Sequence, residues 1–278
     1  MPSWHTVPVM AFTFTSQTVI VTGASSGIGL ELARGLAKRG AALVLVARRQ
    51  ERLEELAQEF RTDCGATVHV VALDLASPTA AGELRAALDA QGVRVTSLIN
   101  NAGCGTFGLF VDDDPATLER EIAVDISTPV RLSTGFLPDI VAAGHGFLIN
   151  VASMAAYTPT PRMAVYGAAK AFILSFTESL WAELRGTGVV AFALSPGATS
   201  TEFNQVVGTD DATAGARPRT ARDVAETAFA HLDKRNPGPS VIDGKANRVA
   251  ASVLRLASRR ATVGMMHRLT DPGRRRGR

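Results

Sequence analysis

Apolar and polar positions between residues 18 and 100 follow two alternating patterns. Short apolar, β-branched runs cover residues 18–22, 42–47, 67–73 and 95–100. The stretches between them, at 27–39, 50–60 and 78–90, repeat apolar residues at helical spacing. Strands that alternate with helix-length segments predict right-handed crossovers and a parallel sheet that helices cover on both faces.

The same alternation continues almost to residue 245. We expect helices at about 115–143, 163–186 and 221–233, and strands at 146–152, 188–195 and 240–242. The chain has no linker-like break before residue 244 and no internal repeat. It therefore predicts one α/β domain over residues 17–245, with a doubly wound parallel sheet of about seven strands, after an N-terminal extension over residues 1–16. The segment 195–220, rich in Gly, Thr, Asp and Pro, is expected to be a mobile excursion that forms a substrate lid.

Composition narrows the class of protein. A hydrophobic content of 46% with 20% charged residues is ordinary for a soluble, well-packed chain. No apolar run approaches the roughly 18 residues that would span a bilayer, and the first 16 residues lack the pattern of a signal peptide. Cys64 and Cys104 form no C-x-x-C pair and lie apart from any histidine cluster, so we expect no metal or disulfide chemistry and a cytoplasmic location.

A glycine-rich turn follows the first strand. Residues 22–29 contain the spacing G-x-x-x-G-x-G, and a helical pattern begins at once. Glycines allow the backbone to approach a ligand, and a helix N-terminus offers free N–H groups to a pyrophosphate. A turn without a ligand is the alternative. The residues expected to contact a dinucleotide are Gly23, Ser25, Ser26, Gly27, Ile28 and Gly29.

In a dinucleotide-binding fold, the end of the second strand selects the cofactor. An acid there would favour NAD, but this chain has Arg48 and Arg49. Guanidinium groups suit a 2′-phosphate by charge and by their forked donors, so the pair predicts NADP(H), with a solvated arginine pair as the alternative. Asp74 and Leu75, after the third strand, could lie beside the adenine, although Asp is also a common helix N-cap.

Tyr166 and Lys170 lie at positions i and i+4 of a predicted helix, which places them on one face. A neighbouring cation lowers the tyrosine pKa from about 10 and makes the phenol a usable general acid or base. Ser153 closes the preceding strand, where its hydroxyl faces the ligand crevice of a parallel sheet. Tyr157 has no lysine at i+4 and is interpreted as a loop or pocket-wall residue.

Together these motifs resemble the short-chain dehydrogenase/reductase family. T-G-x-x-x-G-x-G at 22–29, N-N-A-G at 100–103, the serine, Y-x-x-x-K and P-G-x-x-x-T at 196–201 occur in the family's order and span roughly residues 17–245. The stretches 100–108 and 161–203 look closest to its DltE-like or ketoacyl-reductase-like branch. The resemblance implies a Rossmann fold and an NADP(H)-dependent enzyme that interconverts a carbonyl group and an alcohol.

The resemblance also implies roles for individual residues. Tyr166 would protonate the carbonyl oxygen as hydride arrives, Ser153 would orient that carbonyl, and Lys170 would lower the tyrosine pKa and bind the nicotinamide ribose. Further cofactor contacts are implied for Asn100, Asn101, Ala102 and Gly103 in the middle of the cofactor, and for Pro196, Gly197, Thr199 and Thr201 at its nicotinamide end.

Asp125 departs from the family, which usually has asparagine at this position. There the residue contributes to a water-linked proton relay that reaches the lysine, largely through its backbone carbonyl. A carboxylate keeps the size but adds a charge near Lys170, so we expect either activity with a shifted pH profile or an impaired relay. Cys104 is expected to be a small apolar filler and not a nucleophile.

The C-terminal segment, residues 246–278, is basic. Residues 245–278 contain one lysine, nine arginines and a single acid. Because the whole chain has a net charge of only +3, the rest of the chain is net acidic. Val249, Val253 and Leu256 at i, i+4 and i+7 predict an amphipathic helix, followed by a disordered tail. A helix packed on the domain or on a second subunit and peripheral contact with anionic lipid both remain open. Nucleic acid is disfavoured, because no aromatic residues interleave the arginines.

The leading hypothesis is an oxidoreductase with a small-molecule carbonyl or alcohol substrate, assembled as a homodimer or homotetramer. Phe203, Val206 and Val207 in the lid suggest a lipophilic compound. The alternatives are a catalytically weak NADP(H)-binding regulatory protein and a membrane-surface scaffold of the same fold. The intact serine, tyrosine and lysine favour the enzyme, whereas Asp125 leaves the regulatory alternative open.

Overall fold

A seven-stranded parallel sheet forms the centre of the computed structural model, which describes residues 12–203 and 218–271. Its strand order is β3-β2-β1-β4-β5-β6-β9, and every neighbouring pair is parallel. The strands are β1 (Thr18–Thr22), β2 (Ala42–Ala47), β3 (Val68–Ala72), β4 (Ser97–Asn100), β5 (Gly146–Val151), β6 (Val189–Ser195) and β9 (Ser240–Ile242). The order reverses between β1 and β4, which is the point where doubly wound sheets bind ligands.

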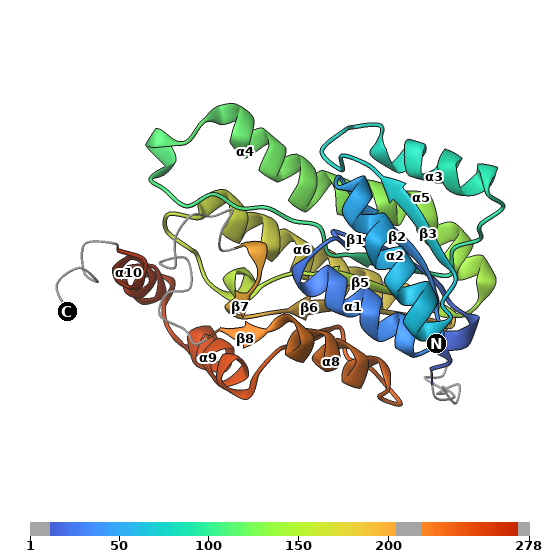
Figure 1. Cartoon of the computed structure of the whole chain (residues 1–278). Coiled ribbons are helices and arrows are strands. Elements are labelled where there is room, and N and C mark those ends of the chain that lie inside the picture. Colours follow the sequence, from blue (N-terminus) through green and yellow to red (C-terminus); the bar gives the residue numbers. More distant parts are fainter. Residues whose placement is uncertain (1–11, 204–217, 272–278) are drawn as a thin grey trace.

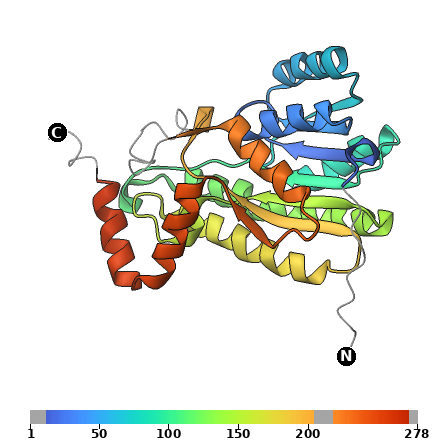
Figure 2. The same cartoon turned by 90° about the horizontal axis from the view of Figure 1, so that it is seen from below.

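Helices cover both faces of this sheet (Figure 1, Figure 2). One face carries α1 (Gly27–Lys38), α2 (Gln50–Cys64) and α8 (Ala221–Leu232); the other carries α3 (Ala80–Ala90), α5 (Thr128–Ala143) and α6 (Ala164–Glu183). Successive strand residues point to opposite faces, so Val19 and Val21 join the first apolar layer while Ile20 joins the second. The doubly wound fold expected from the alternating pattern is therefore confirmed.

The single helix expected at 115–143 is wrong in one respect. The structure divides it into α4 (Pro115–Ile122), a π-helical segment η3 (Ala123–Ser127) and α5. Pro129 in the first turn of α5 has no backbone N–H, so the regular hydrogen-bond ladder cannot pass through it. The wider π turn reorients the chain at this point and leaves Val124 and Asp125 buried.

The end of the N-terminal extension packs onto the domain. Phe12 lies edge-to-face against Phe147 of β5, with ring centres 5.3 Å apart, and Phe14 lies 6.0 Å from Phe229 of α8. Phe14 is buried in the first apolar layer and begins the short helix η1 (Phe14–Ser16). Residues 12–16 therefore extend the core of the domain beyond its first strand.

Two helices follow β9 where we expected one helical segment. These are α9 (Lys245–Leu256) and α10 (Arg259–Leu269), which lie side by side at one end of the molecule (Figure 2). The hydroxyl of Ser258 accepts a hydrogen bond from the backbone N–H of Ala261 and so caps α10. The C-terminal tail after residue 271 and the lid residues Val206 and Val207 lie outside the described residues.

Short elements complete the described chain. They are the helices η2 (Phe110–Asp112) and η4 (Met154–Tyr157) and the parallel pair β7 (Thr199–Ser200) and β8 (Arg219–Thr220), which the sequence pattern did not indicate. Within residues 12–203 and 218–271, no helix is both long and apolar enough to traverse a bilayer.

Candidate active site

The segments singled out in the sequence meet at the carboxyl edge of the sheet. The glycine turn leaves β1, residues 100–103 leave β4, and Ser153 follows β5. Because β1, β4 and β5 are neighbours in the sheet, these three segments come together at the switch point. The topology therefore assembles, at one edge, motifs that are far apart in the chain.

The glycine turn is held against the end of β4. The Thr22 hydroxyl accepts hydrogen bonds from the backbone N–H groups of Asn101 (2.9 Å) and Ala102 (3.0 Å), and the Asn101 side-chain amide donates to the Thr22 carbonyl (2.9 Å). A Cβ at Gly29 would lie 2.4 Å from the Gly23 carbonyl oxygen, so this approach requires glycine. Gly23 also has a positive φ of 65°, which glycine tolerates.

An arginine contacts the same turn. Arg49 donates to the Ser25 hydroxyl at 3.1 Å and forms an ion pair with the Glu202 carboxylate at 2.9 Å. The Ser26 hydroxyl, at the N-cap of α1, also pairs with Glu202. The hydrogen bond from Arg49 lowers the pKa of Glu202. The guanidinium and the two serines thus surround an anionic group beside the helix N-terminus, which fits a cofactor phosphate. Arg48 is exposed next to them.

Asp74 is tied to a neighbouring helix. It forms an ion pair with Arg120 of α4 at 2.8 Å and accepts a hydrogen bond from the Ala76 N–H at 3.1 Å. Partial burial alone would raise its pKa, but these two interactions outweigh it and hold the pKa below its usual value. Leu75 is buried, and its carbonyl accepts a hydrogen bond from Thr128. The adenine contact expected of this pair remains a prediction.

Lys170 and Asp125 form a buried ion pair. The Lys170 Nζ lies 2.7 Å from Asp125 Oδ1 and donates to the Val151 carbonyl at 3.3 Å. The other carboxylate oxygen accepts the Cys104 N–H at 3.1 Å. A Cβ at Gly103 would come within 2.6 Å of Asp125 Oδ1, so the N-N-A-G motif requires its last glycine here. Asp125 therefore contacts the lysine through its side chain, as the added charge led us to expect.

Tyr166 lies beside this pair. Burial raises its pKa, while the Lys170 charge and a hydrogen bond with Ser153 act to lower it; the charge of Asp125 raises it further. The net pKa of Tyr166 is above its ordinary value. Burial alone would lower the pKa of Lys170, but the Asp125 carboxylate, with smaller contributions from Tyr166 and Cys104, outweighs burial and raises the pKa, so the ammonium stays charged.

Ser153 and Tyr157 occupy different parts of the site. Ser153 caps η4 by accepting the Ala155 N–H at 3.1 Å, and its side chain pairs with Tyr166. Tyr157 instead pairs its hydroxyl with Ser195 at 3.3 Å, and the Arg255 guanidinium of α9 lies 5.8 Å from its ring centre. The structure thus joins Ser153, and not Tyr157, to the tyrosine–lysine pair.

The segment after β6 lies over the turn. The Thr201 side chain approaches Gly27, where a Cβ would lie 3.2 Å from the threonine methyl. Gly197 packs against the Asn247 side chain of α9 and leaves no room for a Cβ, and Thr199 donates to the Gly197 carbonyl at 3.0 Å. Pro196 contributes its carbonyl to the Met154 N–H. This arrangement brings residues 196–201 to the glycine turn.

Sequence reasoning missed part of the site and misplaced one residue. The Asn100 side chain donates to Asn150 at 2.8 Å inside the core, so it serves the sheet and not the crevice. Glu121, one helical turn before Asp125, is buried and bonded to Thr106. Its i, i+4 spacing from Asp125 was the available signal. Burial, with the charge of Asp125, raises the pKa of Cys104 to about 12, in keeping with an inert thiol.

Comparison with known proteins places this geometry in a family. The model of the short chain dehydrogenase family matches residues 17–212. A short-chain dehydrogenase of Pseudocercospora fijiensis is 36% identical over 67% of this chain and 61% of its own length, and sulfoacetaldehyde reductase 2 of Chromohalobacter salexigens is 37% identical over 77% and 87%. A short-chain dehydrogenase of Sphingobium yanoikuyae, solved in complex with NADPH, superimposes with a TM-score of 0.76 at 33% identity over 86% of this chain and 93% of its own. The chain thus belongs to the short-chain dehydrogenase family.

Proposed function

We propose that this protein is an enzyme that transfers hydride between NADP(H) and a carbonyl group or secondary alcohol. The observation that carries the proposal is the contact of Tyr166 with Ser153 and with the charged Lys170, beside the glycine turn. A phenol, a hydroxyl and an ammonium in this order provide a proton, an orienting hydrogen bond and a stabilising charge for one carbonyl oxygen. The NADPH complex of a relative at 33% identity supports the cofactor.

The chain's own groups perform distinct parts of the reaction. NADPH supplies the hydride when it is bound. Ser153 donates a hydrogen bond that orients the carbonyl oxygen, and Tyr166 delivers a proton to that oxygen. Lys170 holds its charge because of Asp125 and favours the phenolate that remains. In the direction of oxidation, the same phenolate removes the proton of the alcohol.

The cofactor site follows from the residues around the glycine turn. The backbone of the turn and the N-terminus of α1 would hold the pyrophosphate, and Arg49 and Arg48 would hold the 2′-phosphate. The carboxylate of Glu202 pairs with Arg49 and with the Ser26 hydroxyl, and Arg49 also donates to Ser25. Because these groups already hold an anion beside the helix N-terminus, they support the assignment of a phosphate site. The contacts of residues 101–103 and 196–201 with the cofactor belong to the same proposal.

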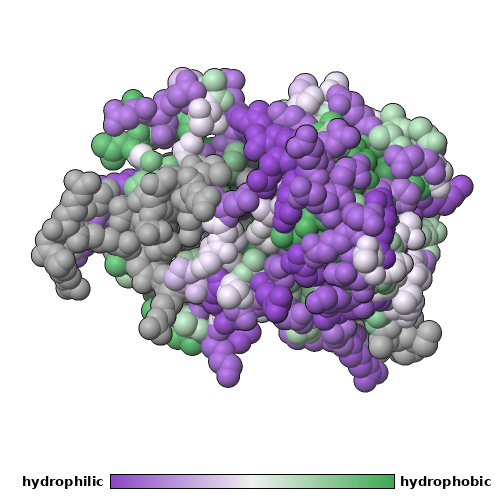
Figure 3. All heavy atoms as spheres, in the orientation of Figure 1, coloured by the Kyte–Doolittle hydropathy of each residue, from purple (hydrophilic) through white to green (hydrophobic). Residues whose placement is uncertain are grey.

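A lipophilic substrate agrees best with the surroundings of the tyrosine. The Phe203 ring lies 5.4 Å from the Tyr166 ring, and the Met163 methyl group approaches the same loop at Gly105. Phe110 and Val111 are exposed and add apolar surface just before α4. Figure 3 shows that apolar (green) and hydrophilic (purple) atoms are mixed over this face of the molecule. A regulatory protein that binds NADP(H) without turnover is the second candidate, and turnover separates the two.

Binding of the two cofactors tests the role of the arginines. Wild type is expected to bind NADPH more tightly than NADH by about 10- to 100-fold, because a hydrogen bond to a charged group contributes about 1.5–3 kcal/mol. Arg49→Gln and Arg48→Asp should each reduce this ratio, mainly by weakening NADPH binding. Fluorescence titration with both cofactors measures it, and Arg52→Gln on the exposed side of α2 is the control. Equal affinities in wild type would refute the assignment.

Removal of the phenol tests the proton donor. Tyr166→Phe is expected to lower turnover by about 10²–10⁴-fold, the usual contribution of a general acid, with NADPH affinity close to that of wild type. Tyr157→Phe is the matched control and should keep most activity. The measurement is NADPH oxidation followed by absorbance with a panel of carbonyl compounds. Retention of more than about a tenth of the turnover by Tyr166→Phe would place the chemistry elsewhere.

The charge of Asp125 should set the pH dependence of oxidation. Asp125 raises the pKa of Tyr166, so replacing its carboxylate by an amide lowers that pKa. Oxidation requires the phenolate, and Asp125→Asn is therefore expected to begin its rise in rate at lower pH than wild type. The readout is the pH–rate profile with the chemical step limiting. Superimposable profiles would show that the carboxylate has no electrostatic effect on Tyr166. Loss of cofactor binding would show that Asp125 is needed for the structure of the site.

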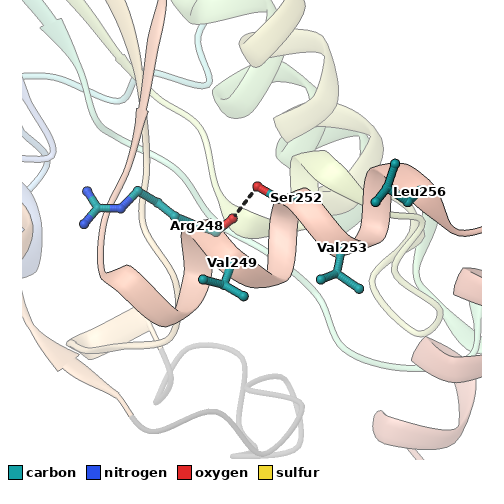
Figure 4. Close-up of a pocket in the computed structure, with 5 residues that line it drawn as sticks. All are labelled: Arg248, Val249, Ser252, Val253 and Leu256. Carbon is teal, nitrogen blue, oxygen red and sulfur yellow. Dashed lines mark hydrogen bonds between the residues drawn. The ribbon is translucent and has the colours of Figure 1, made fainter.

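We also propose a partner surface on the C-terminal helices. Val249, Val253 and Leu256 of α9 are 64%, 60% and 90% exposed, and they line a shallow groove together with Arg248 (Figure 4). On α10, Val263, Met265 and Leu269 are exposed among arginines, and residues 245–270 contain no acid. Apolar side chains beside unopposed arginines fit an anionic lipid surface.

The catalytic domain would work in the cytoplasm, as a homodimer or homotetramer.

Vesicle binding tests this surface. The full chain is expected to co-sediment with vesicles containing phosphatidylserine, and much less with neutral phosphatidylcholine vesicles or at high salt, because each arginine contributes about 1 kcal/mol near such a surface. A double variant, Val253→Ser with Leu256→Ser, should lose most of the binding and keep its turnover. No binding by wild type, together with a dimer in light scattering that the variant abolishes, would assign the face to a second copy.

A further inference from the structure

Glu121 is a buried acid that the proposed mechanism does not use. Only 1% of it is exposed, although it lies at the end of α4, a helix with an otherwise accessible surface. Its Oε2 accepts two hydrogen bonds, and its Oε1 is buried with no hydrogen-bond partner among the described residues. Burying a carboxylate oxygen without a hydrogen-bond partner costs free energy, so the burial of Glu121 calls for an explanation.

Glu121 and Asp125 each hold one point of the chain after β4 by accepting hydrogen bonds from it, and we call these two sets of hydrogen bonds the clamps. Asp125 accepts the backbone N–H of Cys104, and Glu121 accepts the backbone N–H and the hydroxyl of Thr106, both at 3.0 Å. The two acids are one helical turn apart, and the two amides are two residues apart in the chain. The helix end therefore fixes both ends of residues 104–106, which we call the wall segment.

The wall segment lies against the tyrosine that the proposed mechanism uses. A Cβ at Gly105 would lie 3.1 Å from the Tyr166 ring and 3.1 Å from the Phe203 ring. Gly105 is the residue between the two clamped amides. The position of the wall relative to the phenol, and hence the width of the space in front of it, depends on both acids.

Glu121 also changes charge near neutrality. Burial raises its pKa to about 7; the hydrogen bonds from Thr106 lower the pKa and the charges of Asp125 and Asp113 raise it. The ionisable groups that interact with it come from the wall segment, the end of η2, η3 and α6: Cys104, Asp113, Asp125 and Tyr166. The proton has a place on Oε1, the oxygen without a partner, while Oε2 keeps both hydrogen bonds from Thr106.

We propose that Glu121 is a positioning residue, which holds the wall segment against Tyr166 and takes up or releases a proton on its free oxygen as the pH changes. An ionised Glu121 strengthens the hydrogen bonds to Thr106 and adds a negative charge that opposes the phenolate. Protonation of Glu121 weakens these hydrogen bonds and removes the negative charge. Its influence on turnover rests on the proposed function, but its proton uptake does not.

Thermal unfolding tests the proton uptake without any substrate. The folded protein keeps the proton up to a higher pH than the unfolded chain, so wild type loses stability as the pH rises from about 4.5 to about 7. Glu121→Gln lacks this loss. The melting temperature of the variant minus that of wild type is therefore expected to increase between pH 5 and pH 7.5 and to level off above. A difference that stays constant with pH, as expected for the exposed control Glu119→Gln, would overturn the proposal.

Kinetics test the clamp. Thr106→Val removes the hydroxyl donor with little change of shape, and Glu121→Ala removes the acceptor; each is expected to raise KM for the carbonyl compound by roughly tenfold with kcat changed much less. Glu121→Gln keeps the acceptor oxygen, so its KM should stay close to that of wild type, while its turnover should lose the pH dependence near 7. An unchanged KM in Thr106→Val, or a Gln variant no better than Ala, would overturn the positioning role. If wild type turned over no carbonyl compound with NADPH, the proposed function would fail, and the melting temperatures would still decide the proton uptake.

Discussion

An ammonium group removed from water needs a compensating charge, and this requirement organises the centre of the molecule. The side chains of Lys170 and Asp125 are 6% and 0% exposed, so neither could remain ionised alone. The lysine comes from α6 and the aspartate from the π-helical segment before α5. Their pairing fixes these two elements relative to each other and to the end of β5, whose carbonyl takes a further hydrogen bond from the lysine. A buried pair of this kind is weak evidence for added stability, but it specifies one geometry.

The rest of the site is arranged around that pair. After β4, the second carboxylate oxygen of Asp125 accepts a hydrogen bond from the backbone N–H of Cys104. Two residues later, the carboxylate of Glu121 accepts one from the backbone N–H of Thr106. Tyr166 therefore experiences one ammonium and two acids, in a place where burial already disfavours the phenolate. An asparagine in place of Asp125 could accept only one of the two hydrogen bonds from the lysine and from Cys104, through its single amide oxygen, and would carry no charge. In this chain the pKa of Tyr166 thus depends on one cation that lowers it and two acids that raise it. The same two acids also hold the chain after β4 in place, so a change in either acid alters both the pKa and the geometry.

The C-terminal helices are attached to the same region. Asn247 of α9 packs against Gly197, and Arg255 lies over the ring of Tyr157, which contacts Ser195 at the end of β6. These contacts join α9 to the two segments that follow β5 and β6. Its apolar residues Val249, Val253 and Leu256 point away from the domain, in contrast to the inward-facing stripe of α1. A partner on this face would therefore bind next to the catalytic edge of the sheet and not behind it.

Hydrophobic periodicity along the chain by itself determines the architecture. The strand and helix positions follow from it because burial on both faces of a parallel sheet demands runs such as 42–47 and stripes such as that of α1. The glycine turn, Tyr166, Lys170 and Ser153 were also accessible, since each motif is local in the chain. Only the tertiary structure decided what these residues face. The π turn at 123–127, the burial of Glu121, the turn of Asn100 into the core and the outward direction of Val253 all depend on packing between distant segments. Local sequence sets which conformations are available, whereas long-range packing and desolvation decide which charges meet.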